Sequence, residues 1–282
     1  MLRAPFRYAR SYVGPVKACI LDWSGTTVDK YVLAPAVVFV EVFNKYKVPI
    51  TMAESRQPMG LRKDLHIKAI TEMPSVRQRW KEVHGKYPDQ TDVDAMFKDF
   101  VPMQMAVLAK YSEMLPGSAQ AVKTLKEEFG CKIGVTTGFT RSMVDVILPE
   151  AKKQGFVPDV NVTGDEVING VRPKPFMLYR NLDLLDVPDL HSVVKVDDTL
   201  AGVGEALSAG CWGVGVARYS NYMDVDSLEA ESELEGEELS RRLDKSRSLL
   251  VQSGAHYVID TIAELPDVVE DINGRLARGE RP

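Results

Sequence analysis

The chain has 282 residues, of which 45% are hydrophobic and 27% are charged, and its net charge is -5 at pH 7. This composition is typical of a globular protein large enough for one α/β domain with a second, inserted domain. The net negative charge argues against nucleic acid as a partner, because proteins that bind the phosphate backbone concentrate an excess of Lys and Arg. No apolar run reaches the roughly 20 residues that a membrane-spanning helix needs, so we predict no membrane partner either.

The cysteines and the N-terminal tail bear on the cellular location. Cys19, Cys131 and Cys211 lie in apolar segments and are odd in number. We interpret them as buried, reduced thiols, which favours a cytoplasmic protein. The tail at residues 1–15 contains three arginines and no acidic residue, and this pattern is similar to a mitochondrial targeting sequence. A basic tail without any targeting role has the same composition, so both interpretations stay open.

Short apolar runs that end in polar turns predict the strands of a buried parallel sheet. They cover residues 16–23, 132–137, 192–198, 212–217 and 256–260. Helical patterns follow at residues 118–130, 141–155, 175–185 and 263–279. The alternation of strand and helix predicts an α/β fold with a doubly wound, Rossmann-like parallel sheet, formed by residues 16–30 and 111–282. We expect the acidic segment 231–247 to be an exposed helical face.

The segment between the first two predicted strands, residues 31–110, carries helix signals and no strand pattern. Pro35 is placed to begin one helix, and Thr51 with Glu54 forms a capping box for the next. Thr91 can cap a further amphipathic helix. We therefore predict a helical cap domain inserted after the first strand.

Polar side chains at four strand ends or turns suggest phosphoryl chemistry. Asp22 follows the first apolar run, in the stretch LDWSGTTVD, where a carboxylate can act as a nucleophile. Such a reaction also needs a hydroxyl and a cation to hold the phosphoryl oxygens, and a metal ion. We predict that Thr137 is the hydroxyl donor and Arg172 the cation, and that Asp22 and Asp198 bind Mg²⁺ through hard oxygen ligands. Thr136 is the alternative to Thr137, which we favour because it directly precedes the glycine of the turn.

With these residues in this order, the sequence resembles the haloacid dehalogenase superfamily. The resemblance implies that the backbone carbonyl of Ser24 is a further Mg²⁺ ligand. In most phosphatases of this kind the position of Ser24 is instead a second aspartate, which serves an oxygen leaving group. A second acid is also common four residues after Asp198, where this chain has Gly202. Asp197 is a candidate to compensate for that missing acid.

The most informative stretch of the predicted cap is RQPMGLRKDLHIKAITEMP, residues 56–74. It carries Lys63 and His66, which share one face of a helix that we expect to begin near Leu61. Together with the strand-end motifs, this stretch makes nearly the whole chain similar to the phosphonoacetaldehyde hydrolases, a family of the superfamily. The resemblance implies that Lys63 forms a Schiff base with the substrate aldehyde. We assign His66 as a proton shuttle and Met59, in the motif before Lys63, as a substrate-binding residue.

This chemistry accounts for Ser24. Protonation cannot help a carbon leaving group as it helps an alkoxide, so cleavage of a C–P bond requires an electron sink on the neighbouring carbon. A protonated imine on Lys63 is such a sink, and when Asp22 attacks phosphorus the departing carbon becomes an enamine.

The resemblance thus implies Mg²⁺-dependent hydrolysis of phosphonoacetaldehyde to acetaldehyde and phosphate, in the degradation of 2-aminoethylphosphonate. It also implies a homodimer joined through the caps, for which the apolar residues Val38, Phe39 and Phe43 offer weak support. Two alternatives are a general phosphatase of the same fold, which Ser24 disfavours, and a binding protein that keeps the fold without catalysis.

Overall fold

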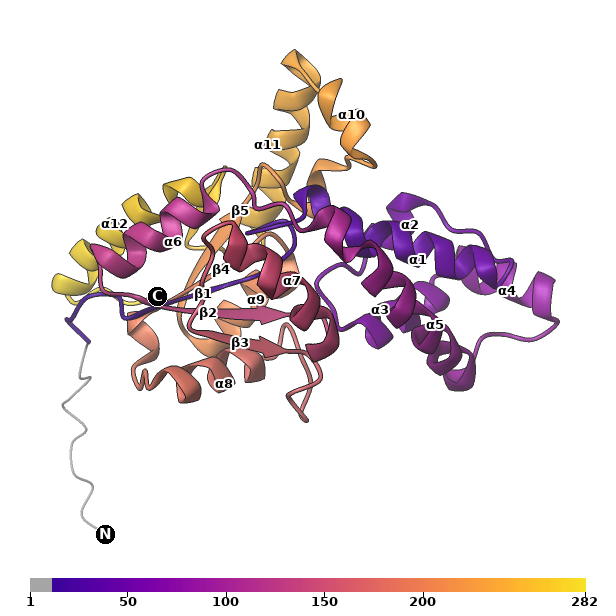
Figure 1. The fold of residues 1–282 in the computed structure, drawn as a ribbon, viewed down its shortest axis with the longest axis horizontal. Coiled ribbons are helices and arrows are strands. Elements are labelled where there is room, and N and C mark those ends of the chain that lie inside the picture. The colour runs from indigo at the N-terminus through magenta and orange to yellow at the C-terminus, as the bar shows by residue number, and fades with distance from the viewer. Residues whose placement is uncertain (1–11) are drawn as a thin grey trace, which may run out of the picture.

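The computed structural model describes residues 12–282, and in this part of the chain a six-stranded sheet lies beside a lobe of helices (Figure 1). The strands are β1 (Ala18–Leu21), β2 (Lys132–Thr137), β3 (Val160–Thr163), β4 (Val193–Asp197), β5 (Trp212–Val216) and β6 (Tyr257–Ile259). All neighbouring strands run parallel, in the order β3-β2-β1-β4-β5-β6. This arrangement confirms the doubly wound parallel α/β sheet that the sequence predicts.

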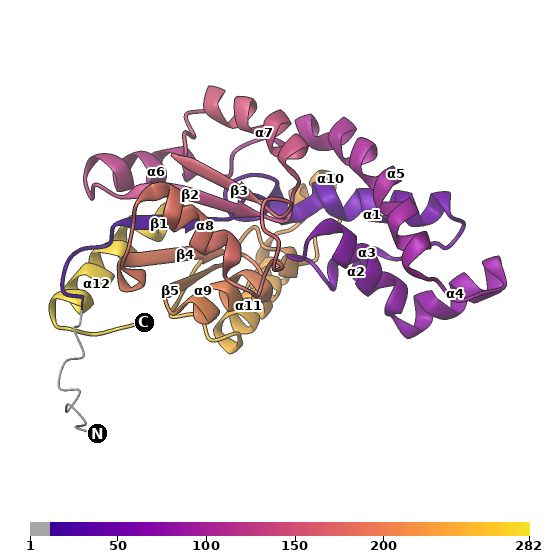
Figure 2. The same cartoon turned by 90° about the horizontal axis from the view of Figure 1, so that it is seen from below.

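Two layers of helices cover the two faces of the sheet (Figure 2). One layer contains α6 (Ser118–Glu127), α7 (Arg141–Lys153) and α12 (Leu265–Ala277), and the other contains α8 (Phe176–Leu185), α9 (Leu200–Ala209) and α11 (Gly236–Gln252). Cys19 and Leu21 of β1 pack in one apolar cluster with the first layer, whereas Ala18 and Ile20 pack with α8 and α9. A strand that is buried on both faces is a continuous apolar run, which is the pattern that predicted β1.

The lobe of helices follows β1 in the chain and is drawn from indigo to purple in Figure 1. It consists of α1 (Leu33–Lys45), α2 (Met52–Arg56), α3 (Lys63–Glu72), α4 (Pro74–His84) and α5 (Gln90–Leu108), and no strand occurs in residues 33–108. Helices α1 and α3 both pack against α5, where the rings of Phe39 and Phe100 stack with their centres 4.5 Å apart. We call this lobe the cap. It lies at the C-terminal ends of the strands, where parallel sheets bind ligands.

The first cap helix begins two residues earlier than the sequence predicts. We expected Pro35 to start it, but α1 begins at Leu33. The reason is that the carboxylate of Asp29 accepts the N–H of Ala34 at 3.1 Å and so caps the first turn. Pro35 then lies within that turn, where its missing N–H removes no helical hydrogen bond.

The N-cap residue of α5 is Asp89, whereas the sequence suggested Thr91. The carboxylate of Asp89 accepts the N–H groups of Thr91 and Asp92, and the carboxylate of Asp92 accepts the N–H of Asp89. A carboxylate also interacts favourably with the positive end of the helix dipole, which a hydroxyl does not, and this favours Asp89. The capping box of Thr51 and Glu54 at the start of α2 is confirmed.

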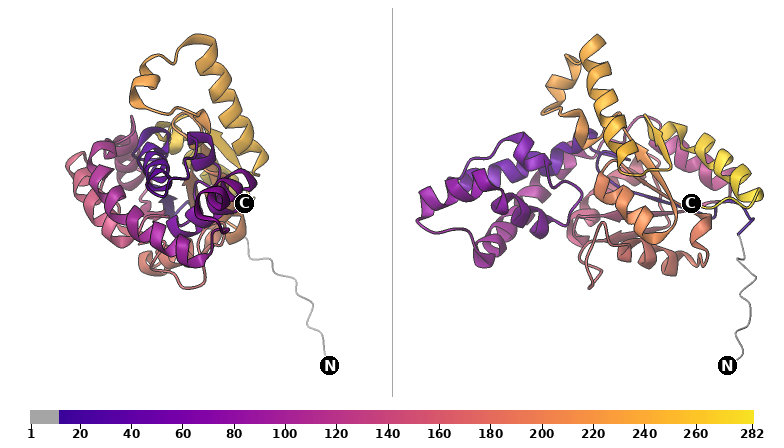
Figure 3. Two further views of the ribbon diagram at one scale, coloured as in Figure 1. Left: turned by 90° about the vertical axis from the view of Figure 1, so that its right-hand side faces the viewer. Right: turned by 180° about the vertical axis from the view of Figure 1, so that it is seen from behind.

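Two segments outside the cap differ from the sequence prediction. The pattern did not reveal β3, because this strand has only four residues at the edge of the sheet and two of them are only partly buried. The expected helical face at residues 231–247 is divided between α10 (Leu228–Ser232) and α11, which project together from the sheet (Figure 3).

The chain enters the cap through a strained backbone. Asp29, Tyr31 and Val32 have φ angles of 56°, 61° and 57°, in a region that side chains other than glycine rarely adopt. The two crossings between sheet and cap include the short 3-10 helices η1 (Lys30–Val32) and η2 (Ala109–Tyr111). Three more such turns lie in the remaining described chain, namely η3 (Leu190–Ser192), η4 (Asn221–Met223) and η5 (Ile262–Glu264).

The cysteines have the environment that the sequence predicts, since Cys19, Cys131 and Cys211 are all buried and free. Within residues 12–282, no helix combines the length and the hydrophobicity that a membrane crossing demands. The similarity to a targeting sequence concerns a tail of which residues 1–11 lie outside the described residues.

Candidate active site

The sequence-predicted site residues of the core come together at the C-terminal ends of β1, β2 and β4. In the sheet register, Leu21 pairs with Val135 on one side and with Val196 on the other. The polar residues just beyond these positions therefore emerge next to one another. Seven of the eight predicted site residues line a single cavity between sheet and cap, namely Asp22, Ser24, Met59, Lys63, Thr137, Arg172 and Asp198.

Arg172 holds the carboxylate of Asp22 at the bottom of this cavity. Its Nη2 donates to Oδ1 of Asp22 at 2.7 Å, and both side chains are buried. The same nitrogen donates to the carbonyl and the hydroxyl oxygens of Thr136, each at 2.7 Å. Burial raises the pKa of Asp22, and the positive charge of Arg172 opposes that shift. The ionised form of Asp22 therefore depends on nearby cations.

The two threonines at the end of β2 have different surroundings. Oγ1 of Thr136 donates to Glu205 at 3.2 Å and accepts from Arg172, so Thr136 helps to hold the guanidinium of Arg172 in place. Thr137 lines the cavity, and its Oγ1 accepts the N–H of Phe139 at 3.1 Å. Of the two, Thr137 is the one that faces the space available to a substrate.

Three carboxylates at these strand ends are arranged to hold a cation. One oxygen each of Asp22, Asp197 and Asp198 lies within 4.8 Å of the other two. Oδ2 of Asp198 accepts the backbone N–H of Asn221 at 2.9 Å, whereas Oδ1 is buried and has no hydrogen-bond partner among residues 12–282. Burial raises the pKa of Asp198 well above its ordinary value, and the charge of Asp197 adds to the shift. A hard cation such as Mg²⁺ fits this oxygen-only donor set and would satisfy the orphaned oxygen.

The carboxylate of Asp197 is already paired with cationic side chains of the protein. Its Oδ2 accepts from Nζ of Lys195 at 2.8 Å and lies 3.2 Å from Nη1 of Arg172, while Oδ1 accepts from the hydroxyl of Thr199 at 2.7 Å. Burial alone would raise the pKa of Asp197, but Arg172 and Lys195 hold it below its ordinary value. Asp197 is thus the permanently ionised carboxylate of the group.

Lys63 enters the cavity from the cap. We expected its helix to begin near Leu61, but α3 begins at Lys63 itself, which is 5% exposed. The pKa of the amine is lowered to about 8, chiefly by burial; the charges of Asp22 and Asp29 oppose this shift, and the charge of Arg172 adds to it. Nζ lies 4.9 Å from the ring centre of Phe139, whose side chain helps to exclude water from the amine.

His66 lies behind Lys63, among the cap helices and outside the cavity lining. Its ring is fully buried and stacks on Phe39 with a centre-to-centre distance of 3.8 Å. Nε2 lies 2.7 Å from the carbonyl oxygen of Ser55 and must carry the proton, because a carbonyl only accepts. Nδ1 is then an acceptor without a partner among the described residues. Burial, together with the charge of Lys63, holds the pKa of His66 well below its ordinary value.

The cap is closed over the cavity. A Cβ atom on Gly60 of the cap would lie 2.8 Å from Oγ1 of Thr199, and one on Gly138 would lie 2.7 Å from the carbonyl oxygen of Leu61. The space that remains beside Met59 and Lys63 measures about 20 Å³, which is room for about one water molecule. A substrate can therefore enter only when the cap moves.

Comparisons with known proteins assign the chain to a family. A family model described as haloacid dehalogenase-like hydrolase matches residues 16–210. A phosphonoacetaldehyde hydrolase of Paraburkholderia xenovorans is 43% identical over 267 residues, which cover 95% of this chain and 99% of that protein. The chain belongs to the phosphonoacetaldehyde hydrolase family.

Two further comparisons agree with this assignment. A phosphonoacetaldehyde hydrolase of Syntrophobacter fumaroxidans is 40% identical over 273 residues, or 97% of this chain and 98% of its own. The crystal structure of a phosphonoacetaldehyde hydrolase-like protein from Oleispira antarctica superposes over all of both chains with a TM-score of 0.93 and 36% identity. The resemblance to the phosphonoacetaldehyde hydrolase family that the sequence suggested is confirmed.

In this member of the phosphonoacetaldehyde hydrolase family, sequence analysis missed the polar residues beneath the site. Lys195 and Glu205 are fully buried, and Nε of Arg172 donates to Oε2 of Glu205 at 3.2 Å. A signal was present for both, because Lys195 lies between two valines of β4 and Glu205 is the one charged residue of α9, and such charges are buried only when they are paired. Asn221 was also missed, and neither its type nor its neighbours mark it in the sequence.

Proposed function

We propose that the protein is a Mg²⁺-dependent phosphonoacetaldehyde hydrolase, which converts phosphonoacetaldehyde and water to acetaldehyde and phosphate. One observation carries the proposal: a carboxylate of the core, Asp22, and an amine of the cap, Lys63, line the same small cavity. A nucleophile and an amine are the two groups that C–P cleavage next to an aldehyde requires. The names of the relatives support this substrate.

In the first proposed step Lys63 attacks the aldehyde carbon, and loss of water leaves an imine. The amine must be neutral to attack, and with a pKa of about 8 roughly one molecule in ten has a neutral Lys63 at pH 7. Once formed and protonated, the imine withdraws electrons from the adjacent carbon, which carries the phosphorus.

In the second step a carboxylate oxygen of Asp22 attacks phosphorus. The C–P bond breaks, and its electron pair forms the enamine. Arg172 and Thr137 are placed to hold the phosphoryl oxygens. Mg²⁺ bound by Asp22, Asp198 and the carbonyl of Ser24 would supply the positive charge that offsets those oxygens. Protonation of the enamine carbon and hydrolysis of the imine release acetaldehyde, and hydrolysis of the phosphorylated Asp22 releases phosphate.

We assign supporting roles to His66 and Met59. Nδ1 of His66 is an acceptor without a partner among the described residues, and Lys63 lies close enough for its charge to lower the pKa of the imidazole; both support an indirect role in moving protons to and from the amine. Met59 is 6% exposed and forms part of the cavity wall, which supports contact with the two-carbon unit of the substrate.

We further propose a cytoplasmic homodimer joined through the caps, as the family resemblance implies. The buried thiols support a reducing compartment. Val38, Phe39 and Phe43 do not support the dimer, because all three are fully buried inside the cap of one chain. Another part of the cap surface would therefore form the interface. Sedimentation equilibrium of the purified protein tests the dimer.

The activity is tested by incubating the protein with phosphonoacetaldehyde and Mg²⁺ and measuring both products. The proposal requires equal amounts of acetaldehyde and phosphate, and loss of both when Mg²⁺ is chelated. Faster release of phosphate from sugar phosphates would favour the general phosphatase. No Mg²⁺-dependent turnover of any of these compounds would favour a binding protein.

A further inference from the structure

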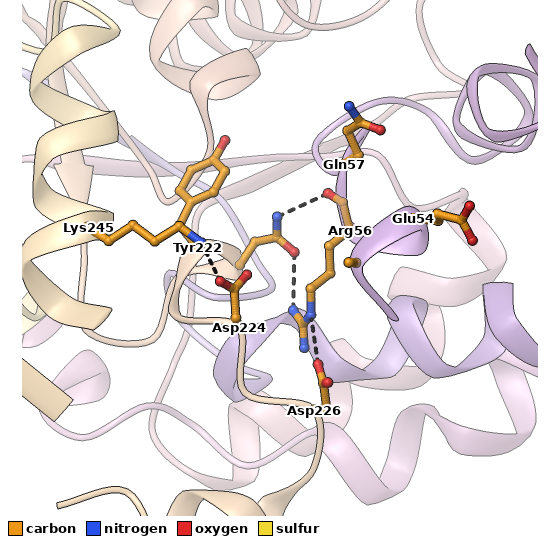
Figure 4. Close-up of a pocket in the computed structure, with 9 residues that line it drawn as sticks. Glu54, Arg56, Gln57, Tyr222, Asp224, Asp226 and Lys245 are labelled. Atoms are coloured by element: carbon orange, nitrogen blue, oxygen red, sulfur yellow. Dashed lines mark hydrogen bonds and ion pairs between the residues drawn. The ribbon is translucent and has the colours of Figure 1, made fainter. Parts of the chain in front are cut away.

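A buried arginine of the cap, Arg56, contacts the core at Asp226 (Figure 4). Arg56 is the last residue of α2 and is 4% exposed. Its guanidinium donates to the carbonyl of Tyr31, at 2.6 Å, in the strained linker between sheet and cap. It also donates to the carbonyl of Val225 and, at 3.3 Å, to the carboxylate of Asp226. One side chain thus joins a cap helix, the linker and the core.

Arg56 and Asn221 form a reciprocal pair across the boundary between cap and core. Nη1 of Arg56 donates to Oδ1 of Asn221 at 3.2 Å, and Nδ2 of Asn221 donates to the carbonyl of Arg56 at 3.1 Å. Asn221 is 3% exposed, and these two bonds use both ends of its side-chain amide. Because both partners are on α2, the side chain of Asn221 is held only while α2 lies against the core.

The same segment of the core holds Asp198. The backbone N–H of Asn221 donates to Oδ2 of Asp198 at 2.9 Å, and the hydroxyl of Ser220 donates to the backbone carbonyl of Asp198, also at 2.9 Å. With Oδ2 occupied in this way, Oδ1 is the oxygen left for a cation. The position of Asn221 therefore decides which oxygen of Asp198 is available and where it points.

A cleft of about 650 Å³ lies along the same boundary, with α2 on one side and the segment around Tyr222 on the other (Figure 4). Its charged side chains are already paired within the protein, as Arg56 is with Asp226 and Lys245 with Asp224. The cleft therefore lacks free charges for a ligand. It shows that side chains of cap and core do not fill this part of their boundary.

We propose that Arg56 and Asn221 are positioning residues that couple closure of the cap to the orientation of Asp198. The inference rests on the proposed function, because it assumes that Asp198 binds Mg²⁺. The cap has to open to admit a substrate, and opening at α2 breaks both side-chain bonds of Asn221. The segment that donates to Asp198 is then released, so the cation site is fully formed only under a closed cap.

The test compares Asn221→Ala with Lys245→Ala, both measured without substrate. Lys245 lines the same cleft but pairs with Asp224 within the core, so its removal leaves the contact with the cap intact. Calorimetric titration with MgCl₂ should show a dissociation constant about 10- to 100-fold higher for Asn221→Ala, as is typical for partners of metal ligands. Amide hydrogen exchange over residues 61–66 should also be faster. Lys245→Ala should match the wild-type protein in both measurements.

A second variant guards against simple unfolding. Arg56→Lys keeps the positive charge but lacks the fork that reaches Asn221 and Tyr31 together, and it should weaken Mg²⁺ binding in the same direction. Because Arg56 and Asn221 share one contact, Arg56→Lys combined with Asn221→Ala should lose less Mg²⁺ affinity than the sum of the two single losses. Mg²⁺ binding within twofold of wild type, with unchanged exchange in both single variants, would overturn the proposal.

The outcomes separate this inference from the proposed function. If the wild-type protein binds Mg²⁺ and the variants weaken that binding, but phosphonoacetaldehyde is not hydrolysed, the coupling stands and the proposed function fails. If the substrate is hydrolysed and the variants bind Mg²⁺ as the wild type does, the proposed function stands and the coupling fails.

Discussion

The carboxylate of Asp197 fills the space that a side chain at Gly202 would need. A Cβ atom on Gly202 would lie 1.8 Å from Cγ of Asp197, far inside the contact distance of two carbon atoms. The acid that the superfamily resemblance leads one to expect at position 202 is absent, and Asp197 brings a carboxylate to the same place from the end of β4. The site therefore keeps its negative charge, paired with Lys195 and Arg172.

Gly202→Asp should displace Asp197 and destabilise the protein by about 1–3 kcal/mol, the usual cost of overpacking a buried site. Combining it with Asp197→Gly removes the clash and restores one carboxylate in that space. Urea unfolding should thus find the double variant more stable than Gly202→Asp alone. Equal stability of these two variants would contradict the account given above.

Asp22→Ala should lower phosphate release by several orders of magnitude, because the reaction loses its nucleophile. Folding should survive, since Arg172 keeps Asp197 and Glu205 as partners. Steady-state kinetics and thermal unfolding measure the two effects, and Asp94→Ala on the exposed surface of α5 is the matched control. Turnover in Asp22→Ala near the wild-type rate would exclude Asp22 as the nucleophile.

Borohydride added together with phosphonoacetaldehyde should inactivate the protein irreversibly and leave the two-carbon unit on Lys63. Lys68 is on the same helix but exposed, so it serves as an internal control and should stay unlabelled. Lys63→Arg keeps the charge without an amine that can condense, and it should be neither labelled nor active. Peptide mass spectrometry identifies the labelled residue, and a label on another lysine would refute the assignment.

The rate of this trapping should depend on pH. Only the neutral amine attacks, and burial lowers the pKa of Lys63 to about 8. The rate should therefore rise about tenfold per unit from pH 6 towards pH 8 and level off above it. Lysines of ordinary pKa would still gain rate up to about pH 10. A rate that is constant from pH 6 to 9, or that keeps rising beyond pH 9, would contradict the lowered pKa.

The protein should discriminate against phosphate esters. Sugar phosphates and phosphoglycolate lack the aldehyde that forms the imine, and with Ser24 two residues after Asp22 they also lack an acid for the leaving oxygen. General acid catalysis is worth about 10² to 10⁴ in rate, so kcat/KM for these esters should be at least about a hundredfold lower than for phosphonoacetaldehyde. Comparable values for the two classes would make the general phosphatase the better hypothesis.

Sequence patterns alone predict the parallel α/β core and the positions of its polar strand ends. Both depend on local patterns: a strand buried on both faces is a largely apolar run, Asp22 stands directly after β1, and Asp198 stands directly after β4. Parallel strands in one sheet end at the same edge, so nearness of these residues followed from the order of strand and helix alone. The motif around Lys63 likewise marked the cap residue that faces them.

The polar groups that surround those residues are set by the packing of the folded chain. Arg56 and Asn221 are 165 positions apart in the sequence. The path of the backbone places the carboxylate of Asp197 where a side chain at position 202 would lie, and no local pattern encodes that path. Burial also changes the acidity of these groups. Desolvation lowers the pKa of Lys63, and desolvation depends on packing between cap and core. A sequence lists which charged groups exist, whereas the fold sets the distances and the water content on which their energies depend.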